Sequence, residues 1–431
     1  MALALFDAAV AAADPAEATA RAVEGLPIER GRRIWIFAFG KAAVPMATAA
    51  VRVLQRSLHS IVGGLVVSGD AAPSPYSTLV SLAGDHPVPG VRSFAASDKI
   101  GALAPGRRSG DVVLVLLSGG TTSLIGAPLT VMSGTDLAQL YELLLGSGLD
   151  VASMNTIRKR FTRWGAGRLA LALSPATTYC FAISDVANDD LAAIASGPCT
   201  PDSTTVGEVV ELLKRTNLFA RIPQAHREYL AMVSRGASPE TPKKTHPAFA
   251  HVSSRVIGSN PLAVDAAAAA ARAHGFVADM SATRLTGEAA RAGETIAKQL
   301  VEHRAAGHAR ECFIWGGETT VTFVGAASAK PTGGGRCQEL ALAAARVLGE
   351  AGENAAGITL LAAGTDGRDG ATDAAGAIVD ATTWRAITDA GQDPAQLLAA
   401  HESNAALQLA DALIPRRDTA TNVNDVVIGL I

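Results

Sequence analysis

The sequence predicts an α/β protein built from two domains, because two kinds of segment alternate along it. Short apolar runs end in glycine or polar turns, at Ile34–Phe39, Ile61–Val67, Val112–Leu117, Tyr179–Ile183, Cys312–Trp315 and Ile358–Ala363. Alanine- and leucine-rich stretches separate them, at Ala42–Leu54, Asp136–Leu145, Arg168–Leu173, Val206–Thr216, Pro261–His274, Thr286–His303, Gln338–Ala351 and Trp384–Ala390. Continuous apolar strands that alternate with helices are typical of a parallel sheet covered on both faces. A chain of 431 residues is also too long for one compact core.

The segment Arg235–Pro247 is the best candidate for a linker. It holds three prolines and four charged residues without apolar periodicity, and strand-helix alternation resumes after it. We therefore expect domains at residues 1–240 and 241–431. We expect both to be α/β layers, with a cleft between them as the ligand site.

Composition excludes several classes of function. Hydrophobic residues make up 48% of the chain, so it can bury large cores, while 4% aromatic residues argue against a base-stacking nucleic-acid module. The net charge of -3, without a long basic run, gives no sign of a polyanion or membrane-surface partner. No apolar run reaches the roughly 18 residues that a membrane span needs.

The cysteines and the first ten residues both bear on where the protein is located. The four cysteines form no C-x-x-C pair, which favours reduced thiols in a cytosolic protein. The start MALALFDAAV lacks a basic region and is typical of a helix rather than a signal peptide. We therefore expect a cytoplasmic protein.

The first motif is Gly40-Lys41, directly after an apolar strand. A lysine at the start of a helix faces the positive end of the helix dipole, which is tolerable when an anion lies beside it. The alternative is a solvated lysine at a strand end, and the residues alone do not decide between the two. The Walker pattern is absent.

The second motif, Ser118-Gly119-Gly120-Thr121, follows the strand that ends at Leu117. The glycines let the backbone approach a ligand, and the hydroxyls can donate to phosphate oxygens. An ordinary strand-helix turn is the alternative, but the position at the carboxyl end of a strand favours a ligand loop. No G-x-G-x-x-G fingerprint of nicotinamide binding is present.

The third motif runs from Asn155 to Arg160 and continues to Gly167-Arg168. It concentrates cations, of which Arg158 is one. A solvated helix face is the usual explanation of such a run. An anion site is the other.

The fourth motif, Ser184 to Asp190, gathers three aspartates after a buried type of strand. Hard oxygen ligands at a strand end suit Mg²⁺ that also holds substrate phosphates, because Mg²⁺ needs only one or two protein carboxylates. Helix capping by Asp189 or Asp190 is the alternative.

The fifth motif extends from Thr332 to Leu340 and places three glycines and Arg336 before a helix. It predicts an anion cradle at the helix start, with Arg336 as a bidentate donor. A flexible loop with a surface arginine is the alternative.

The sixth motif, Gly364 to Gly370, contains Thr365-Asp366-Gly367 after an apolar strand. Its spacing does not fit a calcium loop. A metal or substrate loop is the better interpretation.

The order of these motifs resembles that of the class II glycerate 2-kinases, which join a glycerate-kinase N-terminal domain to a MOFRL domain. The segments that carry the resemblance are Gly40 to Ala43, Asp85 to Pro89, Leu117 to Gly120, Asn155 to Ala170, Ser184 to Pro198, Gly334 to Leu340, Thr365 to Gly367 and Thr421 to Asp425. They span nearly the whole chain.

The resemblance implies a Rossmann-like first domain, a smaller α/β second domain and an active site in the cleft. It implies ATP- and Mg²⁺-dependent phosphorylation of D-glycerate at its 2-hydroxyl, so the partner is a small hydroxy acid, and a homodimer is allowed. Catalytic roles then fall on Lys41, Arg336, Asp185 and Asp189. Nucleotide binding falls on Ser118, Gly119, Gly120, Thr121, Gly334, Gly335, Thr365 and Asp366. Substrate binding falls on Asn155, Arg158, Arg168 and Gln338, and metal binding on Asp189 and Asp366.

Three positions depart from the family pattern, at Gly165, Asn188 and Cys337. Gly165 stands where the family usually has a lysine, so the substrate could be another short sugar acid. Two alternatives to the kinase stay open. One is a hydroxypyruvate reductase, against which the missing dinucleotide fingerprint argues. The other is a catalytically silent protein that binds a nucleotide or a sugar acid.

Overall fold

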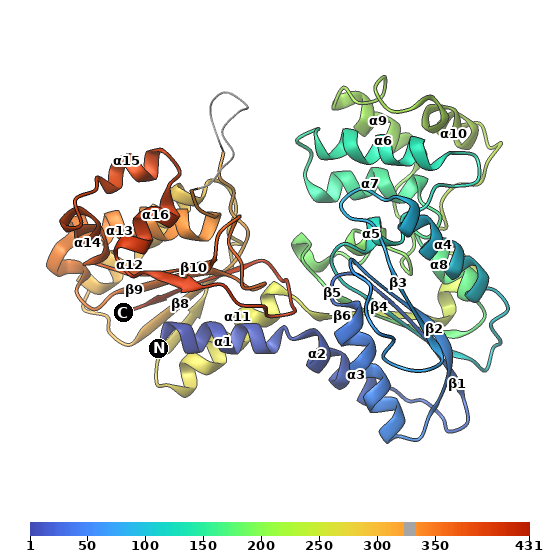
Figure 1. Cartoon of the computed structure of the whole chain (residues 1–431), viewed down its shortest axis with the longest axis horizontal. Coiled ribbons are helices and arrows are strands. Elements are labelled where there is room, and N and C mark those ends of the chain that lie inside the picture. Colours follow the sequence, from blue (N-terminus) through green and yellow to red (C-terminus); the bar gives the residue numbers. More distant parts are fainter. Residues whose placement is uncertain (323–332) are drawn as a thin grey trace. The chain divides into compact units, whose positions relative to one another are not determined.

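The computed structural model describes residues 1–322 and 333–431, and these form two compact units (Figure 1). One unit is Pro15–Ile257, and the other joins Met1–Asp14 to Gly258–Ile431. The sequence placed the boundary at residue 240 and assigned the first residues to the first domain. The structure differs because residues 1–14 pack with the C-terminal unit, whereas residues 241–257 pack with the N-terminal unit.

The N-terminal unit contains the predicted Rossmann-like sheet. Its strands are β1 (Arg33–Phe39), β2 (Ser60–Ser68), β3 (Leu79–Ala83), β4 (Val112–Leu117), β5 (Thr177–Ile183) and β6 (Val252–Gly258). They lie in the order β3-β2-β1-β4-β5-β6, and β1 to β5 pair in parallel. The four predicted strands of this half are confirmed. The sequence missed β3 and β6, whose half-buried and polar residues give no continuous apolar run.

The helices of this unit include a group with its own apolar core. They are α2 (Pro15–Glu24), α3 (Ala43–Arg56), α4 (Val91–Leu103), α5 (Thr121–Leu124), α6 (Gly134–Leu145), α7 (Val151–Phe161), α8 (Arg168–Leu173), α9 (Val206–Arg215) and α10 (Gln224–Ser234), with 3-10 turns η1 (Ala187–Asp189), η2 (Ile194–Ser196) and η3 (Pro247–His251). The group α6, α7, α9 and α10 lies together beyond one end of the sheet (Figure 1). It has its own apolar core, which includes Leu140, Tyr141 and Phe161.

The predicted linker is part of the N-terminal unit. Glu240 pairs with Arg160, and the Thr241 hydroxyl donates to Asp202 Oδ2 at 2.8 Å. The Lys243 ammonium donates to the carbonyl oxygen of Asp202 at 3.0 Å. The prolines and charges that suggested a linker therefore belong to a strap tied to buried ionic partners.

The second sheet is mixed rather than parallel. Its strands are β7 (Val277–Met280), β8 (Glu311–Gly317), β9 (Thr359–Gly364), β10 (Ala374–Asp380), β11 (Leu413–Pro415) and β12 (Asp425–Leu430), in the order β11-β10-β9-β12-β8-β7. β12 runs antiparallel to both β8 and β9, and β10 runs antiparallel to β9. Among the strands of the described residues, the parallel arrangement expected from alternation holds in this sheet for β7 and β8 and for no other pair of neighbouring strands.

Helices cover this sheet. They are α1 (Ala2–Ala12), α11 (Asn260–Ala273), α12 (Ala289–Ala305), α13 (Arg336–Ala351), α14 (Thr383–Asp389), α15 (Pro394–Ala399) and α16 (Ser403–Leu409), with a 3-10 turn η4 (Gly352–Ala355). α12 and α13 pack together, and α13 lies against β9 and β10, whereas α1 packs on α11 and β12 (Figure 1). Among the helices of the described residues, none is both long and apolar enough to cross a membrane.

Candidate active site

The loop of Lys41 meets the loop of Ser118 where the strand order reverses. β1 lies between β2 and β4, so the carboxyl ends of β1 and β4 flank the switch point of the sheet, where α/β proteins bind ligands. The Lys41 amide donates to the carbonyl oxygen of Gly119 at 2.9 Å. The Ala42 amide donates to Ser118 Oγ, also at 2.9 Å. The structure therefore brings the first and second motifs together.

Two glycines allow this close approach. Gly40 has a φ of +120°, and a Cβ there would lie 2.6 Å from the backbone oxygen of Ser118. A Cβ on Gly119 would lie 2.8 Å from Asp185 Oδ2, which places that carboxylate beside the loop. Three neighbouring strands, β1, β4 and β5, thus each contribute a residue to one edge of the sheet.

The hydroxyls of this loop make hydrogen bonds within the protein. The Thr121 hydroxyl lies 2.7 Å from the carbonyl oxygens of both Phe39 and Ser118. Ser118 is buried, and its Oγ accepts the Ala42 amide. That these hydroxyls also donate to phosphate stays a prediction. Backbone groups and Lys41 are the other candidates for binding a phosphate. Lys41 is exposed and makes no ion pair with the described residues.

Arg158 on α7 has unused donors. Only 7% of the residue is exposed, its guanidinium carbon lies 4.5 Å from the ring centroid of Tyr141, and Nε and Nη2 have no hydrogen-bond partner among the described residues. A buried donor without a partner costs about 1–3 kcal/mol, more for a charged group. The arrangement fits an anion that would satisfy both nitrogens.

His86 belongs to the same neighbourhood. Burial, and then the charges of Lys41 and Arg158, lower its pKa, so the imidazole is neutral near pH 7. A Cβ on Gly120 would lie 3.2 Å from His86 Cδ2, which puts the ring beside the glycine loop. In the sequence, Asp85 to Pro89 contribute only to the family resemblance, and His86 is not among the predicted site residues. A histidine between two loops far apart in sequence gives no local signal.

Two predicted substrate residues have structural roles. Arg168 Nη1 donates to the carbonyl oxygen of Lys159 at 2.8 Å and lies 3.2 Å from those of Thr162 and Gly165, and Nη2 donates to Arg160 O. Its guanidinium closes the carboxyl end of α7, and its contact with a substrate stays a prediction. Asn155 is buried, and its amide donates to Ala193 O at 3.1 Å. It joins α7 to the loop after β5.

Asp189 lies in the same loop, in a left-handed conformation with φ +52°, next to Asn188 with φ +60°. Neither residue is buried. Asp190 Oδ1 accepts the Ala192 amide at 2.9 Å, as a capping aspartate does, and Asp189 stays a candidate metal ligand.

The C-terminal unit gathers the fifth and sixth motifs around Arg336. The guanidinium donates to both carboxylate oxygens of Asp425, from Nε at 2.5 Å and from Nη2 at 2.8 Å, and Nη1 lies 2.9 Å from Glu318 Oε1. Burial raises the pKa of the Asp425 carboxyl to about 6, although the bonds to Arg336 lower it. Arg336 is thus already neutralised by acidic partners.

The predicted anion cradle at the start of α13 is occupied by the protein itself. The carboxylate of Asp369 accepts the Cys337 amide at 3.1 Å and the Gln338 amide at 2.8 Å. A Cβ on Gly335 would overlap that carboxylate, and one on Gly334 would overlap the Ser403 side chain. These glycines therefore allow close packing, and their contact with a nucleotide stays a prediction. Thr332 lies outside the described residues.

Two more predicted ligands are buried and engaged. The side-chain amide of Gln338 donates from Nε2 to Asp369 Oδ2 at 2.9 Å, and the Thr365 hydroxyl donates to Asn424 O at 2.6 Å. Neither side chain is exposed, and both ligand contacts stay predictions. Asp366 is only partly buried, and its Oδ1 accepts the Arg368 amide at 3.1 Å. It stays a candidate ligand of a metal.

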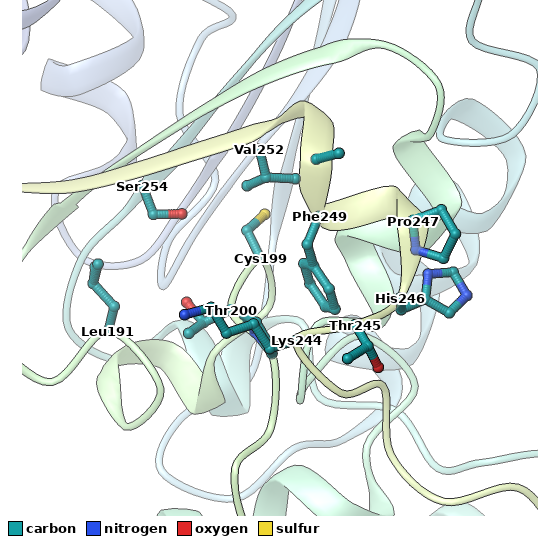
Figure 2. Close-up of a pocket in the computed structure, with 12 residues that line it drawn as sticks. Leu191, Cys199, Thr200, Lys244, Thr245, His246, Pro247, Phe249, Val252 and Ser254 are labelled. Carbon is teal, nitrogen blue, oxygen red and sulfur yellow. The ribbon is translucent and has the colours of Figure 1, made fainter.

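A cavity of about 450 Å³ opens elsewhere on the N-terminal unit. Figure 2 shows Cys199, Lys244 and Phe249 around it, between η3 and the segment after η2. Its lining includes none of the predicted site residues. The cavity is therefore separate from the residues of the six motifs.

Comparison with known families matches both parts of the chain. A family described as a domain of unknown function, DUF4147, matches residues 1–231, and the MOFRL family matches residues 311–425. The DUF4147 match covers the Lys41, Ser118 and Arg158 motifs, and the MOFRL match covers Arg336 and Asp366.

Individual proteins are similar over almost the whole length. The chain is 36% identical to the D-glycerate 2-kinase of Thermotoga maritima, over 95% of this chain and 93% of that protein. It is 35% identical to a protein of Agrobacterium vitis provisionally named a hydroxypyruvate reductase, over 99% of this chain and 93% of that protein. A crystal structure of glycerate kinase from Thermotoga maritima matches with a TM-score of 0.87 at 34% identity, covering 100% of this chain and 98% of that one.

Proposed function

The chain belongs to the glycerate 2-kinase family, and from this premise we propose that it transfers the terminal phosphoryl group of ATP to the 2-hydroxyl of D-glycerate or a closely related short hydroxy acid. Enzymes of this class are phosphotransferases. Phosphoryl transfer asks the protein mainly to position the reactants and to neutralise charge.

The observation that carries the proposal is the pair of nitrogens on Arg158 that have no hydrogen-bond partner among the described residues, on a side chain whose charge, like that of Lys41, acts on His86. A buried guanidinium with two open N–H groups suits a planar carboxylate, which it can bind in a bidentate way. The hydroxy acid would place its carboxylate there. Its hydroxyl would then lie near the glycine loop, with Asp185 or the neutral His86 as acceptor of the hydroxyl proton.

Lys41 would meet the transferred phosphoryl group. Its ammonium is exposed at the switch point, and an ammonium there would stabilise charge that grows on the phosphoryl oxygens. Arg336 is proposed for the same nucleotide, although Asp425 and Glu318 already hold it. That both cations serve one triphosphate stays a prediction.

We propose Mg²⁺ as the metal, with Asp189 and Asp366 as candidate ligands. Both offer carboxylate oxygens that are not fully buried, and Mg²⁺ takes hard oxygen ligands and keeps several waters. When bound, the ion would neutralise phosphate charge. A cytoplasmic location and a homodimer also stay predictions.

The departure at Gly165 bears on the choice of acid. A Cβ at this position would lie 2.6 Å from Thr162 Oγ1 and 3.2 Å from Lys159 Cα. A lysine here, as in most of the family, would need a different local backbone. We therefore include acids other than D-glycerate among the proposed substrates.

The decisive experiment is a screen of ATP consumption over D-glycerate, L-glycerate, hydroxypyruvate and four-carbon sugar acids. Phosphorus NMR identifies the phosphorylated position. We expect turnover with a 2-hydroxy acid. Oxidation of NADH with hydroxypyruvate would support the reductase instead, and binding without turnover across the panel would support a silent binding protein.

Lys41→Ala should lower kcat/KM for the acid at least about a hundredfold, because a donor aimed at growing charge contributes that much or more. Lys214→Ala is the matched control, since Lys214 lies on the surface of α9 and pairs only with Glu211. A loss of about tenfold or less in Lys41→Ala would remove Lys41 from this role.

A further inference from the structure

Two histidines and a glutamate meet at the start of β8. His303 lies in the last turn of α12, His308 lies in the turn that follows, and Glu311 is the first residue of β8. The backbone here is fixed on both sides. The Arg310 amide donates to Ile431 O at 2.8 Å, and the Ile431 amide donates to Glu311 O at 3.0 Å.

Both imidazoles present the same nitrogen to one carboxylate. His303 Nδ1 lies 3.2 Å from Glu311 Oε2, and His308 Nδ1 lies 2.9 Å from Glu311 Oε1. The His303 ring packs edge-on against Phe313, with centroids 4.6 Å apart, which limits its rotation. One potential ligand atom from each of the three residues lies within 4.8 Å of the other two. Among the described residues, this is the one group of three or more such side chains that is so arranged.

We propose that His303, His308 and Glu311 bind one zinc ion, with a fourth position open to water. Zinc prefers four ligands and takes imidazole nitrogen at about 2.0–2.1 Å and carboxylate oxygen at similar length. Tetrahedral ligands at that length lie roughly 3.4 Å apart. The two nitrogen–oxygen distances differ from this by a few tenths of an ångström, which side chains that are partly exposed can absorb.

The ligand set selects the class of metal. Imidazole suits Zn²⁺ and its neighbours among the late transition metals, whereas Mg²⁺ takes oxygen ligands. The zinc site is therefore chemically separate from the Mg²⁺ site proposed above. Within the C-terminal unit, the zinc site is also distant from Arg336. Glu311 and Gly317 are the two ends of β8, roughly 20 Å apart at ~3.3 Å per residue. Arg336 pairs with Glu318, which follows the Gly317 end.

Hydrogen bonds alone are the competing explanation. Each imidazole would then carry a proton on Nδ1 and donate a hydrogen bond to Glu311. That arrangement needs both rings to converge on one carboxylate although His308 is half exposed and loses side-chain freedom by doing so. A metal ion explains the convergence of both rings and predicts binding that hydrogen bonds do not.

The test is zinc binding by the full chain, measured by isothermal titration calorimetry in buffer with excess Mg²⁺, which fills oxygen-ligand sites. We expect about one zinc per wild-type chain and a rise in melting temperature with zinc. His308→Asn and Glu311→Gln should each weaken binding at least ~tenfold, since even outer partners of metal ligands contribute ~10–100-fold. His274→Asn, an exposed histidine at the end of α11, should bind like the wild type.

Three outcomes would overturn the proposal. They are a wild-type chain without stoichiometric zinc, equal zinc affinity in His308→Asn and the wild type, and X-ray absorption of the zinc-loaded wild type that shows sulfur ligands in place of two imidazoles. The last measurement needs no variant. Melting temperatures in EDTA, expected to be alike for all chains, establish that the variants fold.

Discussion

Arg336 is a predicted catalytic residue that also stabilises the fold through its ion pairs. Its guanidinium donates to Asp425, of which only 4% of the side chain is exposed, and pairs with Glu318. Removing the arginine would leave a buried carboxylate without its partner, which is far more costly than losing the pair as a whole. Loss of activity in an Arg336 variant could therefore report unfolding rather than chemistry.

A double variant separates the two effects. Arg336→Met should destabilise the C-terminal unit by about 2 kcal/mol, less than the ~3–5 kcal/mol of a fully buried pair because a third of Arg336 is exposed. Arg336→Met with Asp425→Asn should regain most of that stability, because no unpaired charge remains. Urea unfolding and kcat/KM are measured on both. If activity returns together with stability in the double variant, Arg336 acts only through packing.

The same distinction explains which site residues the sequence could predict. Lys41 and the Ser118 loop were found because each follows an apolar strand and the carboxyl ends of such strands meet. Arg168 and Thr365 were assigned to ligands because their side chains can bind anions, and nothing local reveals that they already donate to protein carbonyls. The partner of Thr365 is Asn424, 59 residues away in the chain, so only the fold could disclose it.

Among the elements, the loops after β1 and β2 offer a matched comparison of two glycines. Gly40 has positive φ and approaches the backbone of Ser118, whereas a Cβ on Gly69 would have nothing within 4 Å. Gly40→Ala should cost about 1–3 kcal/mol and lower kcat/KM severely, because it forces β1 and β4 apart at the switch point. Gly69→Ala should change stability by less than ~0.5 kcal/mol. Denaturant unfolding and steady-state kinetics check this. Equal behaviour of the two variants would mean that the loops need no close approach.

Asp202, which accepts a hydrogen bond from Thr241 of the strap of residues 235–247, gives the N-terminal unit a dependence on acid. Asp202 is buried, and its Oδ1 lies 2.8 Å from Lys159 Nζ. Burial by itself would raise the pKa of Asp202, but the hydrogen bond and charge of Lys159 and the bonds from Thr204 lower it to about 2. A carboxyl with a lowered pKa stabilises the fold above its unfolded pKa of 3.8, and that contribution disappears as the pH falls toward 2.

The shift corresponds to about 2 kcal/mol. Asp202→Asn should therefore be at least that much less stable than the wild type at neutral pH, and the difference should shrink between about pH 4 and pH 2. Urea midpoints across this range measure it. Asp98→Asn is the control, because its exposed pair with Arg163 should contribute little at any pH. A difference that stays constant down to pH 2 would contradict the assignment.

Prediction of elements succeeded where burial is uniform and failed where it is not. β1, β4 and β9 are apolar and almost wholly buried, so each appears as a run in the sequence. β6 alternates exposed and half-buried residues at the edge of its sheet, and β3 is largely half-buried. The mixed second sheet could not be foreseen, because β12 enters between β8 and β9 from the far end of the chain.

At the scale of the whole molecule, the chain's first helix belongs with its last third. Leu5, Phe6 and Ala9 of α1 are fully buried, and α1 packs on α11 and β12. Arg417 pairs with Asp7, and the Thr421 hydroxyl donates to Ala13 O at 2.7 Å. A domain boundary drawn once along the sequence cannot describe this, because the two ends of the chain fold together.

Phe6→Ala should therefore damage the unit that is distant in sequence. Truncating a fully buried phenylalanine typically costs ~3–5 kcal/mol, and here the cavity would open between α1 and its partners in the C-terminal unit. Hydrogen exchange should show faster exchange of the amides of β12 and α11, while those of β1 and β4 keep their protection. Leu3→Ala, on the exposed side of the same helix, should leave both unchanged. If protection instead falls first in β1 and β4, α1 is part of the first unit and the division at Asp14 is wrong.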